Sequence, residues 1–441
     1  MAVTGPPRLV LRYADLGIAT YASLRIVGQP ERTVTWVVEV PILLAALQEL
    51  ADALPDARPG ETAGDALERA VRRSPFASPH GELTLAYILG VLLIAAPAWQ
   101  LLRECVSEPR ATLFVSPSAR LARVPWGLLA MPTTGPTARE LVHARSEAMT
   151  RTGPTAARIP WQLTDIAEHT EGHRLMELVD VLMTVPPNIV AAPRFPARWE
   201  DRRDGPALLV LDPRVPGQRP DSALGSVLGR PSGEMPVVAH FADVMRRRPV
   251  LPEVAGAVEL FRRTDADRRW LAELLRREPG RLVFVGHATA ADDDSGRADR
   301  AALHLAETHP LTAADMIASA LPLPPRVALL ACASGADYRF DEATGLVAAM
   351  VLGGAQTVTA TLWSLPTTRG YRQFAADQTT AATDPMSEVI IAVDRAHQED
   401  AAGCAVNRWQ RQQMRRWRDG DAGAHPLYWA ALVTFAVDGT R

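Results

Sequence analysis

Two short stretches of the sequence decide the fold: Val327-Ala-Leu-Leu-Ala-Cys-Ala-Ser-Gly335 and Leu282-Val-Phe-Val-Gly-His287. Each is an apolar run of strand length that ends at a reactive side chain, Cys332 in the first stretch and His287 in the second. The two residues are 45 positions apart, about the length of a strand–helix–strand crossover plus a loop. A lone cysteine after a strand is usually a small core residue, so the alternative, a nucleophile, needs further support.

Strand and helix patterns alternate along the chain from about residue 110 onward. We expect strands at about 208–213, 281–285, 326–331, 356–362 and 428–437, and helices at about 268–277, 311–321, 342–352 and 385–398. Helices between short apolar strands predict a mostly parallel sheet with crossover connections. Active groups of such sheets lie beyond the carboxyl ends of the strands, where His287 and Cys332 are expected.

The N-terminal region has a different pattern. Alternating apolar and polar side chains predict two strands, 9–27 and 33–40, joined by a turn at 29–32, and helical patterns follow at 41–54, 61–73 and 83–105. We place a domain boundary near residue 108. Residues 83–102 carry no charge and have the length of a membrane span, but Thr84, Pro97 and Gln100 favour a buried core helix.

Composition narrows the function classes. The 441 residues carry a net charge of −3, with 47 basic and 50 acidic residues, so we expect no direct binding to nucleic acid or to a membrane. No lysine occurs, which argues against classical P-loop ATPases and pyridoxal phosphate enzymes. The three cysteines, Cys105, Cys332 and Cys404, and the absence of a signal-peptide pattern favour a reducing cytoplasm.

A histidine and a cysteine at neighbouring strand ends can perform nucleophilic catalysis. The imidazole takes the proton of the thiol and later gives one to the leaving group. Small residues around Cys332 let a substrate approach closely and leave the Cys332 N–H free to face an oxyanion. Neither residue has a second Cys or His at metal-ligand spacing, so we expect no metal and no cofactor.

Two further stretches have alternative interpretations. The acidic run Asp292-Asp-Asp294 could bind a cation or a basic substrate, but a solvated loop is favoured. The stretch Arg408–Arg418, rich in arginine and tryptophan, could contact nucleic acid, but a helix that packs its tryptophans inward is favoured.

The order of the motifs resembles the CHAT domain, a caspase-like and separase-like family of cysteine peptidases. The matching stretches are Leu121–Leu129 with its Pro-Trp pair, Leu208–Pro213, Arg281–His287, Val327–Gly335, Gly345–Trp363 and His425–Ala430. The resemblance implies a caspase-like, mostly parallel sheet with helices on both faces over residues 109–441. Residues 1–108 would then form a small α+β region, a hairpin followed by helices, that could bind a partner.

The resemblance also implies the site residues of a cysteine endopeptidase. His287 would be the general base and Cys332 the nucleophile, and the backbone N–H groups of Ala288 and Cys332 would form the oxyanion hole. We further expect the strand 357–362 to pair with an extended protein substrate. Substrate contacts would come from Leu330, Gly335, Thr359, Thr361 and Trp363. Leu330 stands where relatives that cleave after Arg or Lys have Asp, so a basic P1 preference is not expected.

Two expectations concern the setting of this activity. Relatives are switched on by a partner or a signal, so the chain would belong to a bacterial antiviral defence or cell-death system. Polar loops at 292–300 and 337–342 could respond to an activating partner protein. The alternative function is a catalytically weak scaffold that binds partner proteins, because Ala288 replaces the glycine that usually follows the histidine and resists positive φ.

Overall fold

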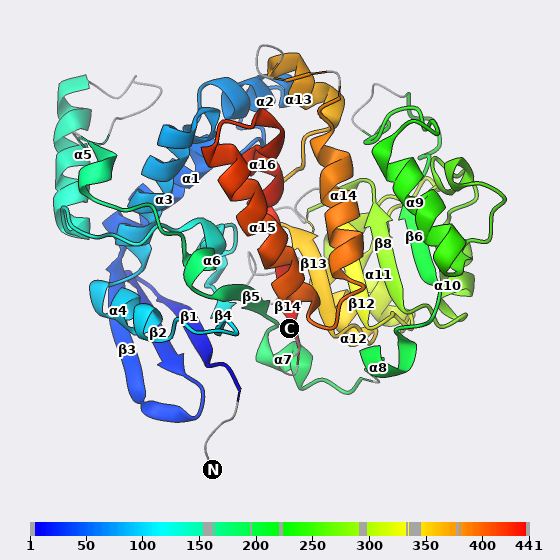
Figure 1. Cartoon of the computed structure of the whole chain (residues 1–441), viewed down its shortest axis with the longest axis horizontal. Coiled ribbons are helices and arrows are strands. Elements are labelled where there is room, and N and C mark those ends of the chain that lie inside the picture. Colours follow the sequence, from blue (N-terminus) through cyan, green and yellow to red (C-terminus); the bar gives the residue numbers. More distant parts are fainter. Residues whose placement is uncertain are drawn as a thin grey trace. The chain divides into compact units, whose positions relative to one another are not determined.

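The structure is a computed structural model of the chain (Figure 1). It describes residues 5–152, 161, 163, 165–194, 196–219, 224–290, 298–331, 334, 345–375, 379–380 and 382–437. Two compact units are present. The first comprises residues 1–54 and 72–181, and the second comprises residues 55–71 and 182–441.

The first unit is built on strands in the order β3-β2-β1-β4. These are β1 (Arg8–Leu16), β2 (Ala19–Ile26), β3 (Gln29–Glu39) and β4 (Thr112–Ser116). The expectation of two strands before residue 40 is wrong, because the chain turns twice, at Gly17 and Gly28. Both glycines have positive φ, 63° and 85°, a conformation that other residues rarely adopt. The helices of this unit are α1 (Val40–Ala53), α3 (Pro79–Leu93), α4 (Ala96–Glu104), α5 (Ala138–Thr152) and α6 (Leu175–Leu178).

The apolar stretch at 83–102 is a core helix that breaks. Residues 85–89 of α3 are fully buried, and the expected single helix over 83–105 is divided because Pro97, in the first turn of α4, has no N–H to donate back into α3. Within the described part of the chain, no single helix is long and apolar enough to span a membrane. The pair α3 and α4, bent by 104°, passes the same test of length and composition only when taken together.

The divisions between the two units do not coincide with the boundary expected near residue 108. β4 follows that position, yet it pairs in parallel with β1 from Arg8↔Thr112 to Arg12↔Ser116. A strand that depends on β1 for its hydrogen bonds belongs to the same unit as β1. The chain passes from the first unit to the second within β5 (Asp180–Thr184).

The second unit contains a mostly parallel sheet, as the sequence predicted. The strand order is β5-β14-β13-β12-β8-β6-β7. The strands are β6 (Ala207–Leu211), β7 (Val250–Leu251), β8 (Arg281–Val285), β12 (Arg326–Leu330), β13 (Thr357–Thr361) and β14 (Leu432–Ala436). All neighbouring pairs from β13 to β7 are parallel, whereas β14 is antiparallel to β13. Every residue of β6, β8, β12 and β13 is buried, which explains the apolar run of β6 and those that follow the first arginine in β8 and β12.

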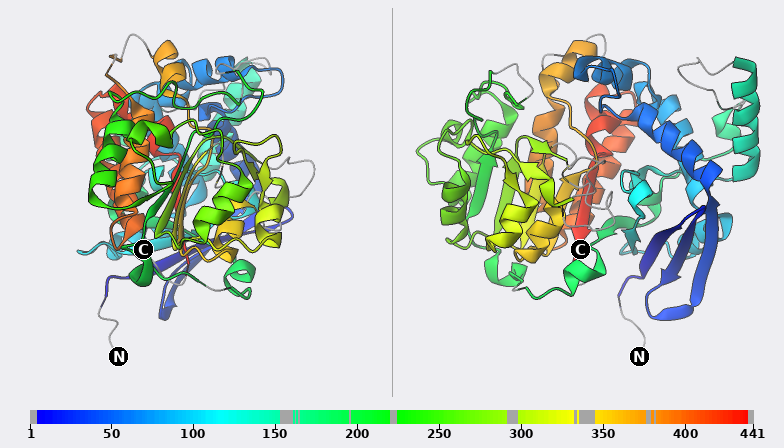
Figure 2. Two further views of the ribbon diagram at one scale, coloured as in Figure 1. Left: turned by 90° about the vertical axis from the view of Figure 1, so that its right-hand side faces the viewer. Right: turned by 180° about the vertical axis from the view of Figure 1, so that it is seen from behind.

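Helices cover both faces of this sheet, as Figure 2 shows in its left view. α9 (Pro236–Arg247), α14 (Pro385–Ala396) and α15 (Ala402–Arg418) pack together on one face, and α11 (Ala313–Ala318) and α12 (Leu346–Leu352) on the other. The remaining helices are α2 (Ala63–Arg72, in this unit up to Val71), α7 (Pro187–Val190), α8 (Trp199–Arg202), α10 (Arg268–Leu275), α13 (Thr368–Phe374) and α16 (Pro426–Trp429). The fold class expected from the sequence is confirmed.

A small antiparallel sheet follows β8. Its order is β11-β10-β9, with β9 (Ala288–Thr289), β10 (Ala302–Leu303) and β11 (Leu311–Thr312). The helix expected at 311–321 therefore begins as a strand, and α11 starts only after Thr312, which caps it through its side chain. The last strand is shorter than expected, because the residues before it form α16.

Candidate active site

The candidate site lies at the carboxyl end of β8, where the chain continues into Gly286 and His287 (Figure 1). β8 pairs in parallel with β12 over five residues, from Arg281↔Arg326 to Val285↔Leu330. Each of these pairs joins residues 45 positions apart. His287 lies two positions beyond the last pair on β8, and Cys332 occupies the matching position in the chain after β12.

Cys332 and Gly335 lie outside the described residues, but their neighbours Ala331 and Ser334 are described and buried. The Ser334 N–H donates to the Ala331 carbonyl at 3.2 Å. The Ser334 hydroxyl donates to the Leu329 carbonyl at 2.6 Å, and the Thr361 hydroxyl donates to the Ala331 carbonyl at 2.5 Å. The residues that flank Cys332 are thus tied to the core of the sheet.

The half-buried ring of His287 has a defined partner. Its Nε2 lies 3.1 Å from the backbone carbonyl oxygen of Gly225. A carbonyl oxygen can only accept a hydrogen bond, so Nε2 must carry the hydrogen. In the neutral ring, Nδ1 is then the basic nitrogen.

The surroundings of His287 favour its neutral form. Burial lowers the pKa of His287 below its usual value. The hydrogen bond to Gly225 and the charge of Asp212 raise this pKa, and the charge of Arg262 lowers it again. Because the net shift is downward, the ring is neutral near pH 7 and is able to accept a proton.

Ala288 presents its N–H away from the neighbouring strand. The His304 N–H donates to the His287 carbonyl at 3.0 Å, and Leu303 pairs with Ala288 in the next position. Hydrogen-bonded and non-hydrogen-bonded pairs alternate along an antiparallel ladder, so the Ala288 N–H points away from β10. The non-glycine residues with positive φ in the described ranges do not include Ala288, so alanine is not strained at this position.

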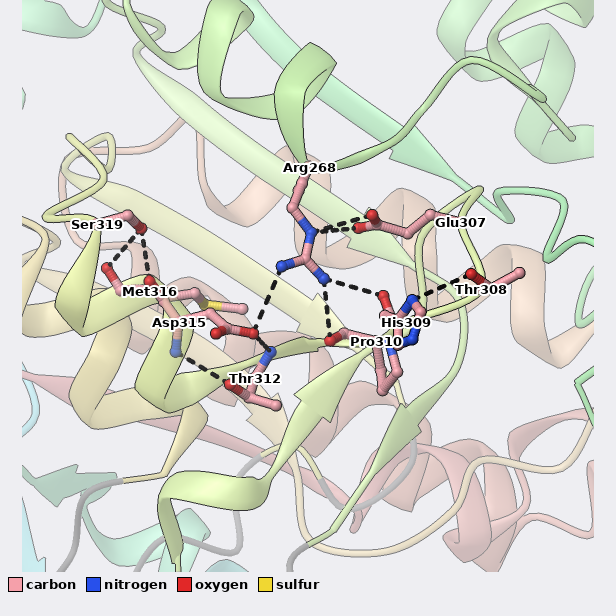
Figure 3. Close-up of polar contacts among 9 residues, drawn as sticks. All are labelled: Arg268, Glu307, Thr308, His309, Pro310, Thr312, Asp315, Met316 and Ser319. Carbon is pink, nitrogen blue, oxygen red and sulfur yellow. Dashed lines mark hydrogen bonds and ion pairs between the residues drawn. The ribbon is translucent and has the colours of Figure 1, made fainter.

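Arg268 anchors the small sheet that carries Ala288 (Figure 3). Its Nε donates to both carboxylate oxygens of Glu307, at 3.1 and 3.0 Å, and its Nη2 donates to the carbonyls of His309 and Pro310. Nη1 lies 3.7 Å from a carboxylate oxygen of Asp315 at the start of α11. One arginine thus ties the first turn of α10 to the connection between β10 and β11.

The four described residues that were expected to contact substrate are core residues. The exposed fractions of Leu330, Thr359, Thr361 and Trp363 are 1%, 0%, 0% and 0%. Thr359 bonds His397 and Thr434, and the Trp363 indole donates to the Leu427 carbonyl. This burial gives no support to a substrate contact by these side chains, and Thr361 instead holds the chain before Cys332.

The expectation that 357–362 pairs with a substrate strand is wrong. β13 is an inner strand, paired with β12 through Thr357–Thr359 and with β14 through Thr357–Thr361. Beyond these pairs, the N–H of Thr361 donates to Ser334 and that of Leu362 to Ala431. Both edges of the strand are already occupied, so no edge is open to a further strand.

Sequence reasoning missed the residues around the imidazole. Gly225, in the connection after β6, is buried and contacts His287. Asp212, at the carboxyl end of β6, and Arg262 act on His287 through their charges. Asp212 could have been found by the rule that drew attention to His287, because it too ends an apolar strand.

Two side expectations have mixed outcomes. Asp292–Asp294 lies outside the described residues. The Arg- and Trp-rich stretch forms part of α15, and Trp417 is buried as expected, whereas Trp409 is only half-buried.

In the ranges that the structure describes, no group of three or more His, Cys, Asp or Glu side chains could hold a metal ion.

The parallel strands β8 and β12 end at Val285 and Leu330 in a mostly parallel α/β sheet, and His287 follows β8 by two residues. Residues 88–437 match the family model of the CHAT domain, so the chain belongs to the CHAT family, as the order of its motifs predicted. A comparison with curated proteins found no match.

The solved structures that match this chain do so at low identity. The complex of the pro- and mature domains of RgpB from Porphyromonas gingivalis is 10% identical, with a TM-score of 0.39, and the match covers 79% of this chain and 70% of that chain. Two structures of the separase–securin complex of Saccharomyces cerevisiae are 11% and 12% identical, with TM-scores of 0.43 and 0.42. Each of these matches covers 98% of this chain but only 30% of that chain. No functional conclusion follows from likenesses of this size.

Proposed function

We propose that the protein is a cysteine endopeptidase in which His287 and Cys332 form the catalytic dyad. His287 Nδ1 takes the proton of the Cys332 thiol, and the sulfur attacks the carbonyl carbon of a peptide bond. The imidazolium gives this proton to the leaving amine as the C–N bond breaks, leaving a thioester. Water, deprotonated by the same ring, then hydrolyses the thioester and restores the thiol.

The pairing register of β8 and β12 carries this proposal. Its constant offset of 45 residues equals the separation of His287 and Cys332, and the two residues follow neighbouring parallel strands that end at the same edge. Two further observations support it. The bond from His287 Nε2 to Gly225 leaves Nδ1 as the base, and the Ala288 N–H points away from β10, which makes it available to an oxyanion.

The test compares wild-type protein with Cys332→Ala and Cys404→Ala variants. We expect new protein N-termini in a bacterial lysate treated with the wild type and with Cys404→Ala, and none with Cys332→Ala. Circular dichroism and thermal unfolding show whether Cys332→Ala is still folded. Cleavage by folded Cys332→Ala at the wild-type rate would exclude this dyad.

The scaffold alternative rested on Ala288, and its extended conformation removes that motive. A non-cleaving scaffold therefore has no specific observation in its favour. It remains one outcome of the same test, since a scaffold would give no new N-termini with the wild type, with or without its partners.

We also propose that a partner protein activates the peptidase within a bacterial defence or cell-death system in the cytoplasm. This part rests on the family and on the sequence, because most of the polar loops at 292–300 and 337–342 lies outside the described residues. The assay adds the products of neighbouring genes to the purified chain. At least a tenfold increase in cleavage is expected, and full turnover by the isolated chain would exclude the switch.

A further inference from the structure

Asp212 is a fully buried carboxylate directly after β6. Its backbone has a positive φ of 51°, a conformation that Asp and Asn tolerate better than most residues. One carboxylate oxygen accepts from the Ser226 hydroxyl at 2.5 Å and from the Leu228 N–H at 3.3 Å, and the other accepts from the Val227 N–H at 3.2 Å. Asp212 thereby holds the three residues that follow Gly225.

Arg262 completes this arrangement from another part of the chain. Its backbone N–H donates to the Leu211 carbonyl at 3.1 Å. Its Nη1 donates both to the Asp212 carboxylate, at 3.3 Å, and to the Gly225 carbonyl, at 3.1 Å. The Gly225 oxygen therefore receives two donors, Arg262 Nη1 and His287 Nε2.

We propose that the Asp212–Arg262 ion pair is a positioning device that fixes His287 with its hydrogen on Nε2 and its Nδ1 directed to the reaction. Asp212 binds the residues that follow Gly225, and Arg262 donates directly to the Gly225 carbonyl. Together they fix the position of this carbonyl. This inference rests on the proposed peptidase function and deepens it. Neither residue touches the substrate, so both act through the carbonyl and the ring.

The charges of the Asp212–Arg262 ion pair act on the His287 ring in addition to the hydrogen bonds that hold it. Asp212 raises the pKa of His287 and Arg262 lowers it, so the two charges of the pair act on the ring in opposite directions. Among the described residues, His304 lies across the small sheet, and burial and then the charge of His287 lower its pKa. Removing one member of the pair should therefore expose the effect of the other.

The test uses Asp212→Asn, Arg262→Gln and Arg262→Lys. Asparagine keeps the shape of Asp212 and tolerates its backbone conformation. In Arg262→Gln the carboxylate of Asp212 retains its three other donors. Arg263 and Asp265, whose side chains bond each other, form a neighbouring ion pair and provide the matched controls Arg263→Gln and Asp265→Asn.

The measurement is nitrogen NMR of labelled histidines, which reports the tautomer and the pKa of His287. The His287→Gln variant identifies the signals of this histidine.

Asp212→Asn and Arg262→Gln should move the pKa of His287 in opposite directions. Asp212→Asn lowers it, Arg262→Gln raises it, and Arg262→Lys and the two controls leave it near the wild-type value. Shifts in the same direction, or shifts no larger than those of the controls, would overturn the proposal, as would a wild-type ring with its hydrogen on Nδ1. The titration needs no substrate, so this result is independent of whether the chain cleaves protein.

Where cleavage is measured, a second readout follows. Misplacing a catalytic group by about 1 Å can cost about 100-fold in rate, so Asp212→Asn and Arg262→Gln should lower kcat/KM by about 10- to 100-fold. The acid limb of the rate profile should move with the pKa of His287, to lower pH in Asp212→Asn and to higher pH in Arg262→Gln. An acid limb that stays in place in both variants would contradict the positioning role.

Discussion

Buried charges occur at both ends of the same parallel sheet, and they serve different purposes. At the amino end, Arg281 and Arg326 are the first residues of β8 and β12, and both are buried. At the carboxyl end, the Asp212–Arg262 pair lies beside half-buried His287. At the amino end, a carboxylate, backbone carbonyls and an aromatic ring bind the buried arginines, whereas the carboxyl end leaves one nitrogen of an imidazole available for chemistry.

The contacts at the amino end are internal. Asp394 of α14 accepts from Arg281 Nε at 2.9 Å and bonds His240 Nε2 at 2.9 Å. Arg326 donates to the carbonyls of His397, Glu399 and Asp400 and lies over the Trp199 ring, 3.5 Å from its centre. Burial alone would raise the pKa of Asp394, but Arg281 and His240 outweigh it and lower the pKa of this carboxyl.

The largest expected effect is on stability at the amino end. Asp394→Ala leaves Arg281 buried without its counter-charge, and removing one partner of such a pair costs about 3–5 kcal/mol of unfolding free energy. Denaturant unfolding measures this loss. Asp243→Ala, at a more exposed ion pair on α9, should stay within about 0.5 kcal/mol of wild type. Equal losses in the two variants would show that the buried pair at the amino end contributes no more than an exposed ion pair.

The second prediction concerns the pH dependence of stability. Burial, and then the charges of Arg326 and Arg281, lower the pKa of His397 to about 3 against the opposing effect of Asp394. The unfolded chain therefore binds a proton below its usual pKa of 6.5, while the folded protein does so only near 3. The stabilisation is complete above pH 6.5 and is lost as the pH falls.

Unfolding free energies at pH 7 and pH 5 measure this effect. His397 should contribute about 2 kcal/mol of the loss between them. His397→Gln should reduce the loss by that amount, whereas His143→Gln, at an exposed histidine, should leave it unchanged. If the His397→Gln and His143→Gln variants lose the same unfolding free energy between pH 7 and pH 5, His397 is not buried and neutral in the folded protein.

The smallest effect is expected at the anchor beside the site. Thr361→Val keeps the shape of the side chain but removes one donor to the Ala331 carbonyl, which keeps the Ser334 N–H as a donor, so the cost is about 0.5–1.5 kcal/mol. Thr35→Val, at an exposed position of β3, is the control and should change stability by less than about 0.5 kcal/mol. Thr361→Val should also slow alkylation of Cys332 in a pulse with a thiol reagent. An unchanged alkylation rate would show that this anchor does not position the cysteine.

Local patterns predicted the part of the site that lies on strands. The apolar runs before His287 and Cys332 predicted two neighbouring parallel strands. The 45 residues between His287 and Cys332 equal the offset between paired residues of β8 and β12. Gly17 marked an extra turn, between β1 and β2, that alternation alone did not separate. Pro97 marked the break between α3 and α4.

The hydrogen-bond partner of the His287 ring could not be predicted from local patterns. Gly225 is 62 residues from His287 in the chain, and only the folded loop brings its carbonyl to the ring. Thr359 and Thr361 were expected to contact substrate because the strand 357–362 was expected to pair with it. Their place on an inner strand between β12 and β14 depends on the sheet order, which the sequence does not encode locally.

The rate at which Cys332 reacts with a small thiol electrophile, measured against pH by mass spectrometry, tests most directly whether His287 activates it. Cys404 and buried Cys105, whose pKa is raised by burial, are internal references in the same sample. We predict that Cys332 reacts at least tenfold faster than both near pH 6.5, and that His287→Gln removes this advantage while the other two rates stay the same. A Cys332 rate that is unchanged in His287→Gln would contradict the account.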